Sequence, residues 1–177
     1  MEAGLDFDVI PSGVDETFRS GETMHEHVLR LSREKARAVA SNHPDSWILA
    51  ADTIVVIDGE VMGKPRTPQD ARTMLAKLSG REHTVITGFA VIKGEGDEYV
   101  CDAVESKVFF KHIPEDEIEW YIATDEPYDK AGGYAMQGMA ACFIKEIRGS
   151  HTNVIGLPLC EVMEALKSAG VVSFRLQ

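Results

Sequence analysis

The chain has 177 residues, of which 44% are hydrophobic, and a formal net charge of −11. This length suits one well-buried domain, and we expect a single domain over residues 1–177. No apolar run approaches the roughly 20 residues that a membrane-spanning helix needs, so no membrane partner is expected. A protein this acidic repels polyanions at long range, which argues against binding to nucleic acid.

Cysteine usage and charge narrow the setting further. Cys101, Cys142 and Cys160 are widely spaced and form no Cys-x-x-Cys pair. This pattern argues against a disulfide framework or a structural zinc site and fits the reducing cytoplasm. A small phosphorylated ligand is still compatible with the acidity, but it would need a local cluster of Lys and Arg, a divalent metal, or both.

Predicted strands and helices alternate in the first half of the chain. Residues 1–5 resemble the end of a helix with Gly4 at its C-cap. After it we expect a short strand, the longest helix, a strand that returns through an Asp-Gly turn, and a helix opened by Thr67-Pro68. These elements are placed at residues 7–11, 23–40, 48–57 with 60–62, and 67–78.

The second half continues the alternation. The predicted elements are strands at 84–93 and 99–111, a helix at 113–123, a strand at 140–147, a helix at 157–168 and a last strand at 171–174. Residues 129–134 are too rich in glycine to be regular. The order indicates an α/β or α+β domain around a largely buried sheet.

One acid and one base stand out around the predicted hairpin. Asp52 follows small residues in an apolar stretch, where we expect a strand end, and Lys64 follows a glycine just past the hairpin. A carboxylate can hold a divalent cation or orient a water, and an ammonium can neutralise a phosphate oxygen. The alternative is a surface hairpin whose Asp and Lys are merely solvated.

Three further positions are weaker candidates. Glu16 lies in an acidic loop after the first predicted strand, and paired acids in loops are usually solvated. Lys35 lies four residues after Leu31, so it shares a helix face with an apolar stripe, although most such lysines are surface residues. Gln137 lies beside a glycine in the polar-aromatic segment, where its amide could read a base edge or simply belong to a turn.

Together these segments resemble the Maf family of nucleoside triphosphate pyrophosphatases, once named for effects on septum formation. The matching motifs arrive in the family's order along essentially the whole chain. They are Phe7-Asp8-Val9-Ile10-Pro11-Ser12 with Asp15-Glu16, Arg33-Glu34-Lys35-Ala36, Ala51-Asp52-Thr53-Ile54-Val55, Gly63-Lys64-Pro65, Leu78-Ser79-Gly80-Arg81 through Thr87-Gly88, Asp129-Lys130-Ala131-Gly132-Gly133-Tyr134 with Gln137-Gly138, and Gly149-Ser150 with Asn153 to Pro158.

The resemblance implies an α/β fold with an elongated mixed sheet and two lobes around a nucleotide cleft. It also implies hydrolysis of a nucleoside triphosphate to the monophosphate and pyrophosphate with Mg²⁺ or Mn²⁺. Asp52 matches the family's proposed general base, and Glu16, Lys35 and Lys64 match its phosphate- and metal-handling residues. We expect Asp52 to position or deprotonate the attacking water, Asp52 and Glu16 to hold the ion, and the two lysines to offset charge on the leaving pyrophosphate.

Substrate choice follows from two further matches. Thr53 and Gln137 match positions that the family links to specificity, and the loop with Gln137 looks like the branch that acts on dTTP and UTP. The branch acting on 7-methyl-GTP carries Glu in place of Gln137. The expected partner is a nucleoside triphosphate, and a homodimer is the assembly left open.

The front of the chain departs from the family pattern. The family opens with a strand and a Ser-x-Ser-Pro-Arg-Arg turn whose arginines bind phosphate, whereas this chain begins after that turn. We therefore expect the chain as given to have reduced activity, because charge-assisted phosphate contacts are missing. A rival hypothesis is a catalytically impaired nucleotide-binding protein that acts in regulating cell division.

Overall fold

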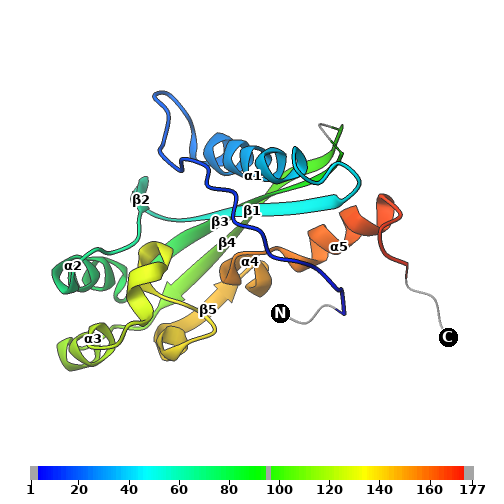
Figure 1. Ribbon diagram of the computed structural model, residues 1–177. Coiled ribbons are helices and arrows are strands. Elements are labelled where there is room, and N and C mark those ends of the chain that lie inside the picture. The colour runs from blue at the N-terminus through cyan, green and yellow to red at the C-terminus, as the bar shows by residue number, and fades with distance from the viewer. Residues whose placement is uncertain (1–3, 95–96, 174–177) are drawn as a thin grey trace.

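The computed structural model describes residues 4–94 and 97–173. Within these residues the strands form one five-stranded sheet in the order β2-β1-β3-β4-β5 (Figure 1). Every pairing in it is antiparallel. The strands are β1 (Trp47–Ile57), β2 (Glu60–Met62), β3 (Glu82–Lys93), β4 (Asp97–Phe110) and β5 (Ile144–Arg148).

Helices and short 3₁₀ turns connect these strands. The α-helices are α1 (Met24–Ala40), α2 (Pro68–Leu78), α3 (Glu115–Ile122), α4 (His151–Ile155) and α5 (Leu159–Ser168). The 3₁₀ turns are η1 (Glu126–Asp129), η2 (Ala131–Gly133) and η3 (Met139–Phe143). No helix among the described residues is long and apolar enough to cross a membrane.

The β1–β2 hairpin closes through the two-residue turn that the sequence predicts. Ile57 pairs with Glu60, and between them Asp58 and Gly59 have φ values of 55° and 75°. Two consecutive positive φ angles match the twist of a tight hairpin, and Asp-Gly adopts them at little cost. The turn keeps β2 short, so β2 pairs only with Val55–Ile57 of β1.

Helix α1 covers one face of the sheet. Its N-terminus is a capping box between Thr23 and Glu26, and Val28 and Leu31 are fully buried. The helix lies so close to β3 that a Cβ on Gly88 would sit only 2.5 Å from the carbonyl oxygen of Val28. The absence of a side chain at Gly88 therefore sets the distance between α1 and the sheet.

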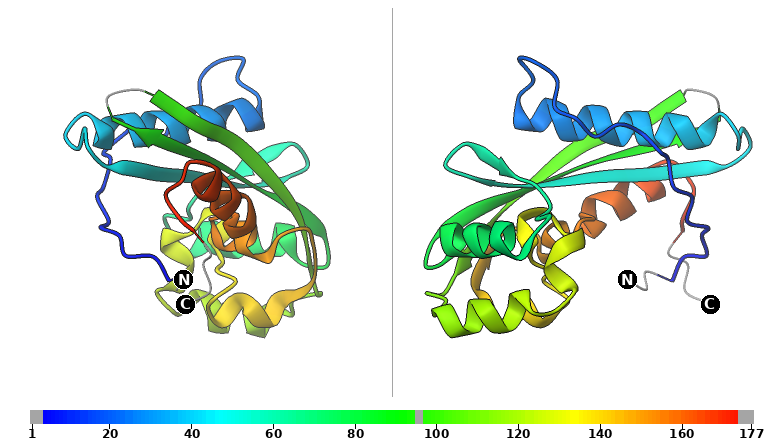
Figure 2. Two further views of the ribbon diagram at one scale, coloured as in Figure 1. Left: turned by 90° about the vertical axis from the view of Figure 1, so that its right-hand side faces the viewer. Right: turned by 60° about the vertical axis from the view of Figure 1, so that its left-hand side comes forward.

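Helix α5 covers the opposite face, as Figure 2 shows. Successive residues of β3 alternate between the two layers: Ala90 packs in the cluster below α1, and Phe89 and Val91 pack against Val162 of α5. A separate and larger cluster, centred on Phe110 and Tyr121, joins α2 and α3 to the far end of the sheet. The core is therefore spread along the sheet.

Most predicted elements are confirmed, with small shifts of their ends. The α/β class, the hairpin and the helices at 23–40, 67–78, 113–123 and 157–168 are all present. The expected mixed sheet is wrong, because the described strands pair only in antiparallel fashion. The predicted strand at 140–147 starts at Ile144, since Met139–Phe143 forms a 3₁₀ turn, and helix α4 was not predicted.

Two predicted end strands are absent from the described residues. Residues 7–11 are irregular and pair with no described strand, and Phe7 and Val9 remain 72% and 83% exposed. An alternating pattern forms a strand only where the segment can pair with the edge of a sheet. Residues 171–173 are also irregular. Phe174 and residues 1–3 of the helix end predicted at residues 1–5 lie outside the described residues.

Candidate active site

A lysine bridges two carboxylates at the centre of the site. Lys35 of α1 donates to Asp52 Oδ1 on β1 at 2.7 Å, and its ammonium nitrogen lies 2.5 Å from Glu16 Oε1. Asp52 is only 8% exposed, whereas the Glu16 side chain is 52% exposed. Three residues that the sequence singled out separately are thus brought into direct contact.

Asp52 does not end a strand as expected, because it lies in the middle of β1. It is accessible for another reason: β2 pairs only with Val55–Ile57 and leaves the outer edge of β1 open beside Asp52. Side chains alternate along a strand, so Asp52 faces α1 while Thr53 faces α4 on the other side. Both residues line one cavity that wraps around this open edge.

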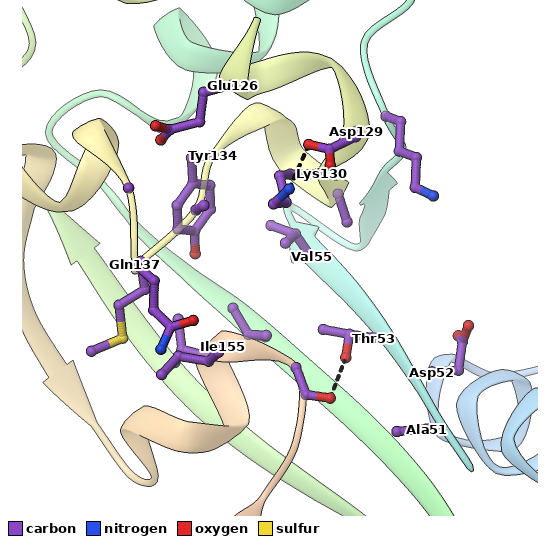
Figure 3. Close-up of a pocket in the computed structure, with 18 of the residues that line it drawn as sticks. Ala51, Asp52, Thr53, Val55, Glu126, Asp129, Lys130, Tyr134, Gln137 and Ile155 are labelled. Atoms are coloured by element: carbon purple, nitrogen blue, oxygen red, sulfur yellow. Dashed lines mark hydrogen bonds and ion pairs between the residues drawn. The ribbon is translucent and has the colours of Figure 1, made fainter. Parts of the chain in front are cut away.

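The cavity has a volume of about 520 Å³ and lies between β1 and the 126–140 segment. Figure 3 shows Asp52 and Thr53 on one side of it and Glu126 and Gln137 on the other. The side with Glu16, Lys35, Asp52 and Lys64 is called the charged wall here. The side with Glu126, Tyr134, Gln137 and Gly138 is called the loop wall, and all eight residues line the cavity.

Lys64 completes the charged wall from the exit of the hairpin. Its side chain is exposed, and it forms no ion pair among the described residues. The chain beside it is tied to the loop wall, because Gly132 N–H donates to the carbonyl of Gly63 at 3.0 Å. Gly132 has a φ of 70°, and a Cβ there would lie 3.1 Å from Val55 Cγ1, which explains a glycine at this position.

Electrostatics favour the charged forms of the bridging residues. The hydrogen bond from Lys35 lowers the pKa of Glu16 below its usual range. Burial acts to lower the pKa of Lys35, but the hydrogen bonds to Asp52 and Glu16 outweigh it, so the pKa of Lys35 is raised. The site therefore presents one ammonium between two carboxylates, a set suited to binding phosphate and a cation together.

The contacts of Arg30 with the loop that carries Glu16 were missed by the sequence reasoning. Arg30 of α1 donates to both oxygens of Glu22, at 2.6 and 3.0 Å, and to the carbonyl of Thr17 at 3.1 Å. The hydrogen bond from Arg30 lowers the pKa of Glu22 to about 2. Phe18 stacks on the ring of His27, with centroids 3.4 Å apart. These contacts fix the exposed loop on both sides of Glu16. In the sequence, the only sign of them was an acid, Glu22, eight residues before Arg30.

A buried polar network supports Thr53. Its hydroxyl lies 2.9 Å from that of Thr87 and 3.4 Å from the carbonyl of Gly156, to which it donates. Thr87 donates to the carbonyl of Asn153, and the Asn153 amide donates to Ser106 on β4. The network connects α4 to the sheet and orients the Thr53 hydroxyl. The sequence did not predict the direction in which this hydroxyl donates.

The loop wall is held by hydrogen bonds rather than ion pairs. Tyr134 is buried, and its hydroxyl lies 2.7 Å from Nε2 of His83. Burial lowers the pKa of His83 to about 4 and raises the pKa of Tyr134. This pair therefore stays neutral. Gln137 lines the cavity, as the sequence reasoning suggested, and its side chain is exposed.

The residues that could hold a metal ion are few. No group of three or more His, Cys, Asp or Glu side chains among the described residues could enclose an ion. Asp52 and Glu16 each use one oxygen on Lys35 and leave the other without a partner in the described part of the chain. Mg²⁺ is commonly bound by one or two carboxylates together with substrate phosphates, so this donor set fits an ion that arrives with the nucleotide.

Comparison with known proteins identifies the family of this chain. A family model described as "Maf-like protein" matches residues 1–169. The chain is 58% identical over 171 residues to the dTTP/UTP pyrophosphatase of Syntrophus aciditrophicus strain SB, covering 97% of this chain and 83% of that relative. The dTTP/UTP pyrophosphatases of Geotalea uraniireducens strain Rf4 and Geobacter sp. strain M21 are 52% and 51% identical, each covering 96% of this chain and 88% of the relative. The chain belongs to the Maf family.

Proposed function

We propose that this chain is a nucleoside triphosphate pyrophosphatase that hydrolyses dTTP and UTP to the monophosphate and pyrophosphate. The observation that carries the proposal is the Lys35 bridge between Asp52 and Glu16, which lies in the same cavity as Gln137. Relatives at 50–58% identity with this activity in their names support the reaction class, a hydrolase acting on a phosphoric anhydride.

The reaction needs a water molecule at the α-phosphorus and charge compensation on the leaving group. The Asp52 carboxylate accepts a proton as the water oxygen bonds to the α-phosphorus. The bond from that phosphorus to the oxygen bridging the α- and β-phosphates breaks, and pyrophosphate leaves with the bond electrons. Lys35 and Lys64 balance the charge that develops on the phosphate oxygens, which is the main demand of phosphoryl transfer.

A divalent cation, Mg²⁺ or Mn²⁺, is part of the proposal. Asp52 and Glu16 would hold it through the oxygens that they do not use on Lys35. Such an ion polarises a phosphate oxygen and lowers the pKa of a bound water. We also place the protein in the cytoplasm, where its nucleotide substrates occur and where its three thiols would stay reduced.

Base choice is assigned to Thr53 and Gln137. The Thr53 hydroxyl has neighbouring acceptors in Thr87 and Gly156, so it directs its proton away from the cavity and offers a lone pair. The Gln137 amide both donates and accepts. Uracil and thymine present carbonyl oxygens and a ring N–H, which these two groups can pair with.

The test is hydrolysis of dTTP in water enriched in ¹⁸O. We expect one labelled oxygen in the monophosphate and none in the pyrophosphate, with activity lost when a chelator removes the cation. Label in the pyrophosphate would place the attack elsewhere and refute the mechanism. Binding of dTTP without turnover would instead support a regulatory nucleotide-binding protein.

A further inference from the structure

Glu126 is a carboxylate inside a cavity that is proposed to hold a polyanion, and the proposed reaction gives it no role. It lies at the start of η1 and contacts the far end of the loop wall. Its Oε2 accepts from Met139 N–H at 2.8 Å, and its Oε1 accepts from Ala140 N–H at 3.2 Å. The Tyr121 hydroxyl donates to Oε1 at 3.0 Å.

These three donors come from two parts of the chain. The two backbone N–H groups are the first of η3, whose N-cap residue offers no side chain, so Glu126 takes the place of a capping residue. Burial, and then the charge of Glu126, raise the pKa of Tyr121, which keeps the phenol a donor. Glu126 thus connects η3 to α3 through a carboxylate whose two oxygens are both occupied.

Gly138 shows how tightly this contact is built. Its φ and ψ are −123° and −159°, so the backbone itself does not demand glycine. A Cβ at this position would lie 2.2 to 2.4 Å from the carboxylate atoms of Glu126. Gly138 is therefore required by the Glu126 carboxylate, which lies directly against the residue that follows Gln137.

Gln137 itself has no side-chain partner that could orient it among the described residues. Its position is set by the backbone on both sides. Before it, Tyr134 is fixed by His83, and Gly138 N–H closes a turn on the carbonyl of Ala135 at 3.3 Å. After it, Glu126 accepts from the N–H groups of Met139 and Ala140, and Ala141 N–H donates to the carbonyl of Gly138 at 3.2 Å.

The charges of the cavity agree with a role at the base end. Lys35 and Lys64 lie on the charged wall and Glu126 lies on the loop wall, while Lys130, which also lines the cavity, is paired with Asp129. A carboxylate repels phosphate, so a nucleotide gains most when its triphosphate lies toward the lysines and its neutral base toward Glu126 and Gln137.

We propose that Glu126 is a positioning residue that fixes Gln137 for recognition of the uracil or thymine base. This rests on the proposed function for the identity of the base. Glu126 does not touch the reacting phosphate. It acts by holding Gly138, Met139 and Ala140, and so determines where the Gln137 amide points.

The main test is Glu126→Gln, which keeps the size of the side chain but turns one acceptor oxygen into a donor that faces backbone N–H groups. We expect kcat/KM for dTTP and UTP to fall about 10-fold, mostly through KM, while the inhibition constant of inorganic tripolyphosphate changes by less than about twofold. Tripolyphosphate has no base, so it reports on the charged wall alone. Glu119→Gln is the matched control, because it breaks only the exposed pair between Glu119 on α3 and Arg72 on α2.

A double-mutant cycle separates positioning from general support of the fold. In a Gln137→Ala background, Glu126→Gln should have less than about twofold further effect on kcat/KM for dTTP. The proposal would be overturned if the two substitutions lower kcat/KM for dTTP independently, so that their effects multiply. It would also be overturned if Glu126→Gln weakens tripolyphosphate binding as much as it lowers kcat/KM for dTTP. If Glu126→Gln does not fold, Gly138→Ala presses on the same carboxylate and should give the same selective loss.

Binding measurements keep this proposal apart from the proposed reaction. The dissociation constants of dTMP and tripolyphosphate can be measured by calorimetry without turnover. If the wild-type chain hydrolyses no dTTP, the proposed function fails, while a selective loss of dTMP affinity in Glu126→Gln still supports the positioning role. Unchanged dTMP affinity in that variant would refute it.

Discussion

The two walls of the cavity are built in different ways. On the charged wall, Lys35 and Asp52 come from a long helix and a central strand and meet through an ion pair. On the loop wall, Gln137 comes from a segment of short 3₁₀ turns, held by hydrogen bonds to Glu126 and His83. The ion pair at the centre of one wall is placed by regular elements, and the other wall by specific contacts along an irregular chain.

This difference separates the two tasks of the site. In the proposed reaction, the charged wall carries the groups that act on phosphate, which every nucleoside triphosphate shares. The loop wall carries the groups proposed to lie near the base, which distinguishes one nucleotide from another. Changes to the charged wall should therefore slow all substrates alike, whereas changes to the loop wall should alter their relative rates.

Asp52→Asn should have the largest effect. Asn keeps the shape of the side chain but can neither accept the proton of the attacking water nor carry the anionic charge that a cation needs. We expect kcat for dTTP and UTP to fall by about 1000-fold each. Pyrophosphate release measures this, with Asp102→Asn on the exposed surface of β4 as the control. A variant that keeps more than about a tenth of the rate would remove Asp52 from the role of base.

Lys35→Met should follow, because it leaves Asp52 and Glu16 without their shared cation. We expect kcat/KM to fall about 100-fold for every nucleotide, since a charge-assisted contact to phosphate is lost. Tripolyphosphate should also bind more weakly, which Glu126→Gln is not expected to cause. A loss confined to dTTP and UTP would contradict the division of tasks between the two walls.

Two residues of the charged wall could be singled out from the sequence for a physical reason. Lys35 falls on the buried stripe of an amphipathic helix, and Asp52 falls in an apolar strand, so periodicity alone directs both toward the interior. The sequence did not reveal that Asp52 lies in mid-strand, because the open edge results from the short pairing of β2. That feature depends on tertiary arrangement rather than on local pattern.

The residues that hold the loop wall and the loop around Glu16 could not be predicted from the sequence. Glu126 is followed in the sequence by proline and looks like an ordinary turn residue, while its partners Met139 and Ala140 lie well down the chain. Arg30 looks like a surface residue of α1. Neither hydrophobic periodicity nor turn chemistry encodes such contacts between irregular segments, since both describe only neighbours in sequence.

The loop wall should also be the more sensitive to mild acid. The pKa of buried His83 is lowered to about 4, so between pH 6.5 and pH 4 the unfolded chain binds a proton that the folded chain does not. Stability from this group is therefore complete above pH 6.5 and falls as the pH decreases. From pH 8 to pH 5 we expect a loss of about 2 kcal/mol, or roughly 30-fold in the unfolding equilibrium.

The measurement is urea unfolding at several pH values for the wild type and for His83→Gln. The glutamine keeps a polar atom near Tyr134 but does not titrate, so the variant should lose less stability than the wild type over that interval. His151→Gln, at an exposed site on α4, should behave as the wild type does. Parallel curves for His83→Gln and the wild type would show that His83 does not carry this pH dependence.

The smallest expected effect tests whether the charged wall, too, depends on an irregular loop. Arg30→Gln removes the donors that hold Glu22 and the carbonyl of Thr17, so the loop around Glu16 should become mobile. Glu16 then contributes less to binding a cation, and we expect kcat/KM to fall about fivefold for all nucleotides while the Mg²⁺ concentration for half-maximal rate rises. Arg72→Gln breaks an equally well-formed ion pair far from the cavity and should change neither value. If Arg30→Gln lowers the rate without changing the Mg²⁺ dependence, the loop does not act through Glu16, and the charged wall reduces to its two regular elements.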